Sequence, residues 1–296
     1  MADTGCAHAE GQYSMTQKVA VSEIAALVAE ATRIRQTGEI QFVEFLNKHT
    51  LEVSPPHCAP DSSAYRSFWE DTHFSILGET YEARRHENFD FDLAQMIECP
   101  YPYITKEPTI IAQQVRDWAN VLAAVDLPPG SRILEMGAGW GNTSLLLAQS
   151  GFEVSVLDIN PLYLDLITER SRRLGLKIDT IEGEFLDITK LDQQYDAVLF
   201  YESFHHCLEH GELLRSLKTR LNTRGRVYFA GEPIIENAPY PWGLNPSGEA
   251  LFQMHTHGWM ELIFDRRYFE ALIESFGFAL NWKHFAQGTQ VAVASL

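Results

Sequence analysis

The chain has 296 residues, of which 45% are hydrophobic and 21% are charged, and its formal net charge is −17 at pH 7. This length and composition predict a globular protein with one large domain, or one domain plus an appendage. The acidic excess, without a dense lysine or arginine cluster, excludes nucleic-acid phosphates and anionic membrane surfaces as partners.

The apolar runs and the cysteines argue against a membrane-spanning protein, a secreted protein, a disulfide framework and a zinc site. No apolar run reaches the roughly 18 to 20 residues that a membrane-spanning helix needs, and the first residues lack the basic-then-apolar pattern of a secretion signal. The four cysteines are scattered without a Cys-x-x-Cys pair, so neither a disulfide framework nor a zinc site is predicted. We expect a cytoplasmic protein, and the sequence leaves a homo-oligomer open.

Residues 1–107 are predicted to form a helical and irregular extension. About the first dozen residues are expected to be disordered. Further along, apolar residues at i, i+3, i+4 and i+7, preceded by a serine, predict an amphipathic helix with a cap. The apolar residues are Ile24, Leu27, Val28 and Ala31, and the capping serine is Ser22.

From residue 108 to residue 296, helical patterns alternate with short apolar runs. We predict strands at residues 132–136, 153–158, 178–181, 196–201 and 226–230, and helices around residues 115–122, 142–149, 161–174 and 208–221. A last helix around residues 269–276 precedes two strands, at 278–285 and 289–294, which predict a terminal hairpin. This alternation predicts an α/β fold, a doubly wound, mostly parallel seven-stranded sheet.

A glycine-rich turn follows the first of these strands. Gly137, Gly139 and Gly141 let the backbone turn sharply and approach a nucleoside closely. A dinucleotide fingerprint requires Gly-x-Gly-x-x-Gly, but the last position here is Asn142. A carboxylate beside the loop, from Glu135, repels phosphates and accepts a hydrogen bond from an ammonium group, directly or through water. The loop therefore predicts a cofactor that carries an amino acid.

Asp158 ends the second strand and is placed to accept hydrogen bonds from both hydroxyls of a ribose. The same role exists in dinucleotide enzymes, so Asp158 alone does not identify the cofactor.

In combination, four segments in order resemble the class I S-adenosylmethionine-dependent methyltransferases, a family with a Rossmann-like fold. They are Ile133–Gly141, Val156–Asp158, Glu182–Phe185 and Tyr195–Phe200. The resemblance covers roughly residues 107 to 296 and implies S-adenosylmethionine as cofactor, with Glu184 and Phe185 at the adenine and Tyr201 near the methionine part. The predicted cofactor-binding residues are Glu135, Gly137, Ala138, Gly139, Gly141, Asp158, Ile159, Glu184, Phe185, Tyr201 and Glu202.

Catalytic candidates follow the fourth and fifth strands, at the edge where open α/β sheets bind ligands. Methyl transfer to a hydroxyl needs a base, and an imidazole has a pKa near neutral pH. His205 or His206 is therefore the predicted base, although either ring could instead pack on the following helix. Glu232 could orient a histidine, bind a sugar hydroxyl, or join Glu202 in holding a divalent cation, while a structural or solvated glutamate stays equally open.

An insertion at residues 235–264 is predicted to be a loop that serves as a substrate lid, with the extension 1–107 also covering the cofactor and substrate site. Its aromatic residues, Tyr240, Trp242 and Trp259, suit stacking on sugar faces. His255 and His257 lack a convergent third ligand, so no metal site is predicted.

Segments of the insertion resemble bacterial methyltransferases of polysaccharide and glycosyl-transfer pathways, which implies a sugar or glycan acceptor. These segments are Pro241–Leu244, Gly248–Leu251 and His257–Leu262. The alternatives are a methyltransferase of another small metabolite, with a phenol, amine or carboxylate as acceptor, and a catalytically inactive cofactor-binding regulatory protein. A nicotinamide oxidoreductase is a distant further alternative.

Overall fold

The structure is a computed structural model that describes residues 16–101 and 104–296. The described residues form two compact units: residues 88–232 with 270–296, and residues 16–87 with 233–269. The unit boundaries differ from the predicted ones, because residues 88–107 belong to the first unit and the insertion extends to residue 269. The prediction about the first dozen residues lies outside the described residues.

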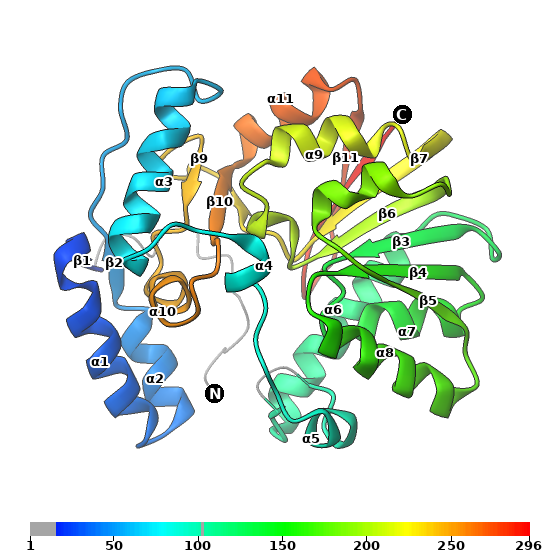
Figure 1. The fold of residues 1–296 in the computed structure, drawn as a ribbon, viewed down its shortest axis with the longest axis horizontal. Coiled ribbons are helices and arrows are strands. Elements are labelled where there is room, and N and C mark those ends of the chain that lie inside the picture. The colour runs from blue at the N-terminus through cyan, green and yellow to red at the C-terminus, as the bar shows by residue number, and fades with distance from the viewer. Residues whose placement is uncertain (1–15, 102–103) are drawn as a thin grey trace. The chain divides into compact units, whose positions relative to one another are not determined.

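The first unit is built on a seven-stranded sheet with the order β11-β12-β7-β6-β3-β4-β5 (Figure 1). The strands are β3 (Arg132–Met136), β4 (Glu153–Asp158), β5 (Ile178–Glu182), β6 (Tyr195–Tyr201), β7 (Leu221–Ala230), β11 (Ala279–Lys283) and β12 (Val291–Ser295). Strands β3 to β7 are parallel, whereas β12 runs antiparallel to both β7 and β11. The predicted mostly parallel seven-stranded sheet with a terminal hairpin is confirmed.

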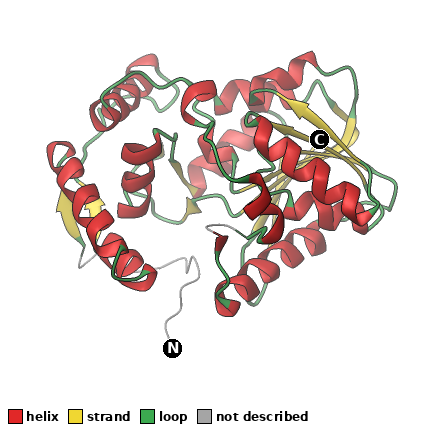
Figure 2. Cartoon of the chain, turned by 60° about the horizontal axis from the view of Figure 1, so that its bottom comes forward, coloured by secondary structure: helices red, strands yellow, loops and turns green. Residues whose placement is uncertain are grey.

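The helices of the first unit lie around this sheet (Figures 1 and 2). They are α5 (Leu93–Glu98), α6 (Pro108–Ala124), α7 (Asn142–Gln149), α8 (Pro161–Leu174), α9 (His210–Leu217) and α11 (Arg266–Ser275), with short 3-10 turns η4 (Phe185–Lys190) and η5 (Phe204–His206). Val121, Leu147 and Ile167, from α6, α7 and α8, share one buried core with Ile133 and Ala197 of the sheet. Because side chains alternate along a strand, Phe200 of β6 faces the other way and packs against Phe204.

Helix α9 is shorter than predicted. It covers His210–Leu217, not residues 208–221. Leu221 pairs with Tyr195 and therefore begins β7, which starts five residues before the predicted strand.

The second unit contains helices and two small sheets. Its elements are β1 (Gln17–Val19), η2 (Val21–Glu23), α1 (Ile24–Arg35), α2 (Glu39–Leu46), β2 (His49–Leu51), α3 (Ser63–Leu77), α4 (Ala83–His86), β8 (Ile234–Ile235), β9 (Trp242–Leu244), α10 (Gly248–His257) and β10 (Leu262–Asp265). The apolar face predicted for the first helix is confirmed, since all four residues are buried in α1. Ser22 does not cap this helix, because it lies inside the turn η2 and Glu23 occupies the cap position.

The insertion at residues 235–264 is an ordered part of the second unit, so the prediction of a loop was wrong. Strand β10 pairs with both β8 and β9. Tyr240 is 5% exposed and Trp242 is 3% exposed, and the indole of Trp242 donates a hydrogen bond to the carbonyl of Pro60 at 2.8 Å. These two rings fill the core of their unit and do not form a stacking surface for sugars. None of the described helices is long and apolar enough to cross a membrane.

Candidate functional site

The predicted site residues of the first unit gather at one edge of its sheet. Strands β3, β4, β6 and β7 are parallel neighbours, so their carboxyl ends lie along the same edge. The turns that follow these four strands carry the glycines, Asp158, the two histidines and Glu232. The topology thus places the predicted cofactor and catalytic residues on adjacent turns, as expected for an open α/β sheet.

The glycine loop needs glycine at two positions for different reasons. Gly137 has φ +70°, and a Cβ atom there would lie 2.7 Å from the Cβ of Ser203, which packs under the loop and donates a hydrogen bond to the carbonyl of Met136 at 2.8 Å. Gly139 has φ +49°, and a Cβ there would meet no atom within 4 Å. The loop is therefore packed on the sheet side at Gly137 and open at Gly139. Ala138, between them, is 8% exposed and belongs to the core.

Glu135 is buried, and the hydroxyls of Thr143 and Ser144, at the start of α7, each donate a hydrogen bond to one of its carboxylate oxygens. Burial raises the pKa of this carboxyl to about 7, against the opposing effect of the two hydroxyls. Glu135 therefore ties strand β3 to helix α7, a role that the sequence interpretation missed. The remaining lone pairs of the Glu135 carboxylate could accept a hydrogen bond from an ammonium group, and this contact stays a prediction.

Asp158 lies beside the loop, and its two oxygens accept hydrogen bonds from different backbone amides. Gly139 N–H donates to Oδ2 and Asn160 N–H donates to Oδ1, both at 2.9 Å. Burial raises the pKa of Asp158 to about 6, although these amides favour the charged form. The backbone amide of Ile159 also favours the charged carboxylate, and the contact of Asp158 with ribose hydroxyls stays a prediction. Ile159, the next residue, is half-buried.

Glu184 and Phe185 follow β5 and lie at the start of η4. The backbone N–H of Glu184 donates to Oδ2 of Asp187 at 3.1 Å, which fixes the turn. The ring of Phe185 packs edge-on against Phe200 with centroids 5.8 Å apart, and its atoms lie 3.3 Å from the Cβ position of Gly137. Phe185 therefore lies beside the glycine loop, and its contact with the adenine stays a prediction.

Tyr201 and Glu202 end strand β6 at the same edge. Burial, and then the neighbouring charge of Glu202, raise the pKa of the Tyr201 phenol far above its ordinary value, so the hydroxyl stays protonated. Glu202 has φ +52°, a left-handed conformation that costs a non-glycine residue about 1 to 3 kcal/mol. The backbone N–H of Glu202 donates a hydrogen bond to the carbonyl of Ala230 at 2.9 Å, which holds Glu202 in this conformation. Such strain concentrates at functional sites.

Glu232 organises the turn that carries the histidines. Its Oε1 accepts hydrogen bonds from the N–H groups of Ser203 (3.0 Å) and Phe204 (2.9 Å). Its Oε2 accepts from the N–H of His205 at 3.0 Å and from Nδ1 of the same residue at 2.8 Å. These four donors match the four acceptor positions of a carboxylate. Of the three predicted functional roles, orientation of a histidine is the one that this geometry supports.

The contact with Glu232 also sets the protonation of His205. A carboxylate only accepts hydrogen bonds, so Nδ1 carries the proton, and Nε2 of the neutral ring is the nitrogen with a lone pair. The side chain of His205 is 10% exposed and that of Glu232 is 1% exposed. The ring of His206 lies 4.3 Å from that of His205, tilted by 35°. Both predicted histidines are therefore at the site edge, and His205 is the one whose tautomer is fixed by Glu232.

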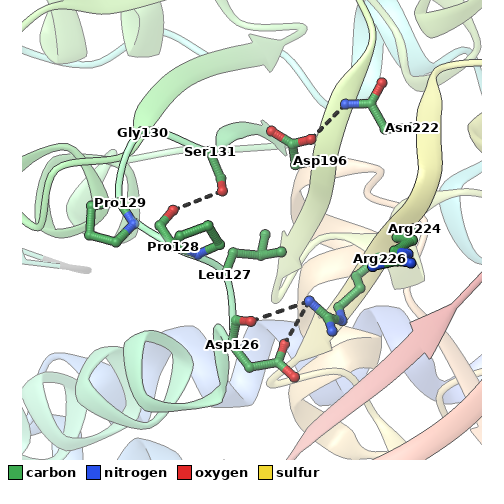
Figure 3. Close-up of a pocket in the computed structure, with 10 residues that line it drawn as sticks. All are labelled: Asp126, Leu127, Pro128, Pro129, Gly130, Ser131, Asp196, Asn222, Arg224 and Arg226. Atoms are coloured by element: carbon green, nitrogen blue, oxygen red, sulfur yellow. Dashed lines mark hydrogen bonds and ion pairs between the residues drawn. The ribbon is translucent and has the colours of Figure 1, made fainter.

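A pocket of about 460 Å³ lies at the opposite edge of the sheet, where the strands begin (Figure 3). Asp196 accepts hydrogen bonds there from the Arg132 backbone N–H at 2.8 Å and the Asn222 side chain at 2.6 Å, and Arg226 forms an ion pair with Asp126 at 3.2 Å. The side chains of Asp126, Asp196, Asn222 and Arg226 are thus paired, and none of the residues that line this pocket was predicted as a site residue.

The residues at the carboxyl edge fit S-adenosylmethionine. The open space above Gly139 leaves the backbone accessible, and the two buried carboxylates suit a ligand with a sulfonium and an ammonium group better than one with phosphates. Asp158 lies beside Gly139, where a carboxylate suits a ribose hydroxyl. The chemistry of this set of residues therefore agrees with the prediction from the glycine spacing.

Comparison with known proteins gives a family match within the first unit. Residues 133–225 match the model of the methyltransferase domain family. The chain is 27% identical over 156 residues to the glycine/sarcosine/dimethylglycine N-methyltransferase of Actinopolyspora halophila, a match that covers 52% of this chain and 27% of that protein. It is 28% identical over 105 residues to the ubiquinone biosynthesis O-methyltransferase of Proteus mirabilis, covering 34% of this chain and 42% of that protein. The chain thus spans less than two thirds of these relatives.

Among solved structures, a Nostoc punctiforme protein proposed to be an O-methyltransferase has a TM-score of 0.50 at 18% identity, and the match covers 80% of this chain and 74% of that chain. At this identity the likeness concerns the fold alone. It agrees with the seven-stranded sheet described above.

Proposed function

We propose, from the premise that residues 133–225 form a class I S-adenosylmethionine-dependent methyltransferase domain, that this protein methylates a hydroxyl group of a sugar or glycoconjugate. The match of residues 133–225 to the methyltransferase domain family supports the predicted cofactor and enzyme class. The acceptor, the base and the roles of individual residues belong to the proposal.

The cofactor is proposed to lie along the carboxyl edge of the sheet. Asp158 accepts hydrogen bonds from the ribose hydroxyls, the open side of the glycine loop at Gly139 faces the nucleoside and methionine parts, and Phe185 packs beside the adenine. Tyr201 and Glu202 lie toward the methionine end. When bound, S-adenosylmethionine supplies a methyl carbon that its sulfonium has already activated. The residues of the chain then have to align the acceptor and remove its proton.

The contact between His205 and Glu232 is the observation that carries the proposal of a hydroxyl acceptor. A hydroxyl must lose a proton as its oxygen is methylated, and Nε2 of His205 is the atom with the lone pair to take it. The carboxylate of Glu232, at 2.8 Å from Nδ1, holds the ring in this tautomer and stabilises the positive charge that it gains. An amine acceptor that is already neutral needs no such base.

The choice of a sugar rests on the resemblance of segments within residues 241–262 to methyltransferases of glycosyl pathways. The second unit contains these segments. It joins the first unit directly after Glu232, at Pro233.

A labelled-methyl screen tests the proposed acceptor class. The full chain is incubated with methyl-labelled S-adenosylmethionine and with nucleotide sugars, oligosaccharides, small phenols or small amines. We expect label in a sugar fraction, at a rate that falls at least a hundredfold in His205→Gln. Label found only in phenols or amines contradicts the sugar acceptor, and undiminished turnover by His205→Gln contradicts the base.

An amine acceptor is the second candidate, favoured by the match to an N-methyltransferase that acts on glycine and its methylated forms. It predicts label in small amines and a rate that stays within about threefold of wild type when His205 is replaced. The same screen therefore separates the two candidates.

A further inference from the structure

Residues 89–100, named here the strap, run between the start of the first unit and helix α6. The strap includes helix α5, which packs against α8. Two of its residues, Met96 and Cys99, are buried at 4% and 5% exposure. The strap is thus seated on the helices of the cofactor domain, and its own sequence carries none of the predicted cofactor-binding residues.

Two asparagines hold the strap at its two ends. The side-chain amide of Asn160 donates a hydrogen bond to the carbonyl of Phe89 at 2.8 Å, and that of Asn142 donates to the carbonyl of Pro100 at 2.9 Å. Asn160 is the N-cap of α8 and Asn142 is the first residue of α7. Each asparagine therefore stands at the beginning of the helix that follows a cofactor-binding turn.

Both asparagines are connected to those turns by a second hydrogen bond. Asn160 donates its backbone N–H to Asp158 Oδ1 at 2.9 Å. The oxygen of the Asn142 side chain accepts from Arg170 at 2.7 Å, and the same guanidinium donates to the carbonyl of Trp140 in the glycine loop. Two short relays thus run from the strap to the cofactor-binding turns, one to Asp158 and one to the glycine loop.

Aromatic packing joins the same parts. The ring of Tyr163, in the first turn of α8, lies 5.7 Å from Phe89 and 5.0 Å from Phe91 of the strap. On its other side it lies 5.9 Å from Trp140 of the glycine loop. The contact is continuous from strap to loop, so a shift of one displaces the packing of the other.

We propose that Asn142 and Asn160 are positioning residues that couple the docking of the strap to the binding of S-adenosylmethionine. Cofactor that fixes Asp158 and the glycine loop favours the docked strap, and by linkage the docked strap strengthens binding of the cofactor by the same free energy. This inference rests on the proposed binding of S-adenosylmethionine at the carboxyl edge.

Two substitutions remove only the donors to the strap. Asn160→Ser keeps an N-cap oxygen for the N–H of Leu162, which Asn160 now holds at 3.0 Å. Asn142→Asp keeps an acceptor for Arg170. Asn222→Ser is the matched control, because it removes one side-chain amide bond of 2.6 Å to Asp196 at the opposite edge of the sheet (Figure 3).

The experiment measures binding and release of S-adenosylhomocysteine, together with hydrogen exchange of the amides of residues 89–100, in the full chain. For each asparagine variant we expect binding to weaken about threefold to tenfold, mainly through faster release. In wild type the ligand should slow exchange in the strap, and this protection should be lost in the double variant Asn142→Asp/Asn160→Ser. Asn222→Ser should change affinity and strap exchange less than twofold.

Three results would overturn the coupling. One is faster strap exchange in the variants with unchanged affinity, and another is unchanged strap exchange in both variants. The third is an equal loss of affinity in Asn222→Ser, which would indicate a general effect on stability. Wild-type protein that does not bind S-adenosylhomocysteine at all removes the shared premise and overturns the proposed function as well.

Discussion

The two edges of the seven-stranded sheet both carry acidic side chains, but Glu135 and Asp158, at the edge where the strands end, are buried, whereas Asp126 and Asp196 are not. At the edge where strands begin, Asp196 and Asp126 are matched by Asn222 and Arg226. At the edge where strands end, burial raises the pKa of Glu135 to about 7 and of Asp158 to about 6. The carboxyl edge also holds Glu202 in a left-handed conformation.

This difference shows where the fold tolerates unfavourable local structure. Desolvated carboxylates and positive φ angles cost free energy, and they accumulate where a ligand is to be bound. A pocket of about 460 Å³ lies at the opposite edge, and a second pocket of about the same volume lies beside helices α6, α7 and α8. Pocket volume therefore does not distinguish a site, and the placement proposed here rests on the desolvated carboxylates.

The largest expected effect is on turnover, from His205. His205→Gln removes the base, so kcat for a hydroxyl acceptor should fall about 10²-fold to 10⁴-fold while affinity for S-adenosylhomocysteine stays within twofold. His206→Gln is the matched control and should lower kcat less than tenfold, because Glu232 orients His205. Steady-state kinetics with a labelled methyl donor measure both, and equal losses in the two variants would contradict the assignment.

The next effect is on affinity, from Asp158. Asp158→Asn replaces an oxygen acceptor by an amide donor at the ribose and should weaken binding of S-adenosylhomocysteine about tenfold to a hundredfold. Asp196→Asn makes the same chemical change at the opposite edge and should alter affinity less than twofold. Calorimetric titration of both variants checks the comparison directly, and similar losses would remove the distinction between the edges.

A pH effect of about tenfold should accompany the raised pKa of Asp158. The unliganded carboxyl has a pKa of about 6, and the charged form is the better acceptor for ribose hydroxyls. Affinity should therefore be constant above pH 7 and fall through pH 6, to about a tenth at pH 5. Asp158→Asn should flatten this profile, and a wild-type profile that is flat from pH 5 to pH 8 would show that Asp158 does not titrate with binding.

The smallest effect is expected at the paired edge. Arg226→Met breaks the partly exposed ion pair with Asp126, which should cost about 0 to 1 kcal/mol of unfolding free energy. Neither affinity nor kcat should change more than twofold. Denaturant unfolding and kinetics test this, and a large loss of activity would place function at the edge where strands begin.

The elements next to the glycine loop follow from local sequence. Strand β3 and helix α7 have the bounds that the pattern predicts, because an apolar run, a glycine turn and a helical run follow one another without overlap. The same pattern places Asp158 at the end of β4. These features depend on residues that are close together in the sequence, and such local patterns can be predicted from the sequence alone.

The partners of Glu232 could not be predicted from sequence, because Ser203, Phe204 and His205 lie 27 to 29 residues away and meet it only when β6 and β7 pair. The helix α10 within the insertion was not predicted, although the sequence contains a helix-capping serine at its start. Ser247 caps α10 by accepting the N–H of Ala250 at 3.2 Å, and serine before such a run is a helix start. The burial of Trp242 could not be predicted from nearby residues, because its hydrogen-bond partner, the carbonyl of Pro60, is distant in the sequence.

The most direct test of the central claim is calorimetric titration of the full chain with S-adenosylhomocysteine and, separately, with NADH. We predict saturable binding of S-adenosylhomocysteine alone, at one site per chain, and much weaker binding to Asp158→Asn. Binding of NADH, or S-adenosylhomocysteine affinity that Asp158→Asn leaves unchanged, would contradict the placement of S-adenosylmethionine at the carboxyl edge of the sheet.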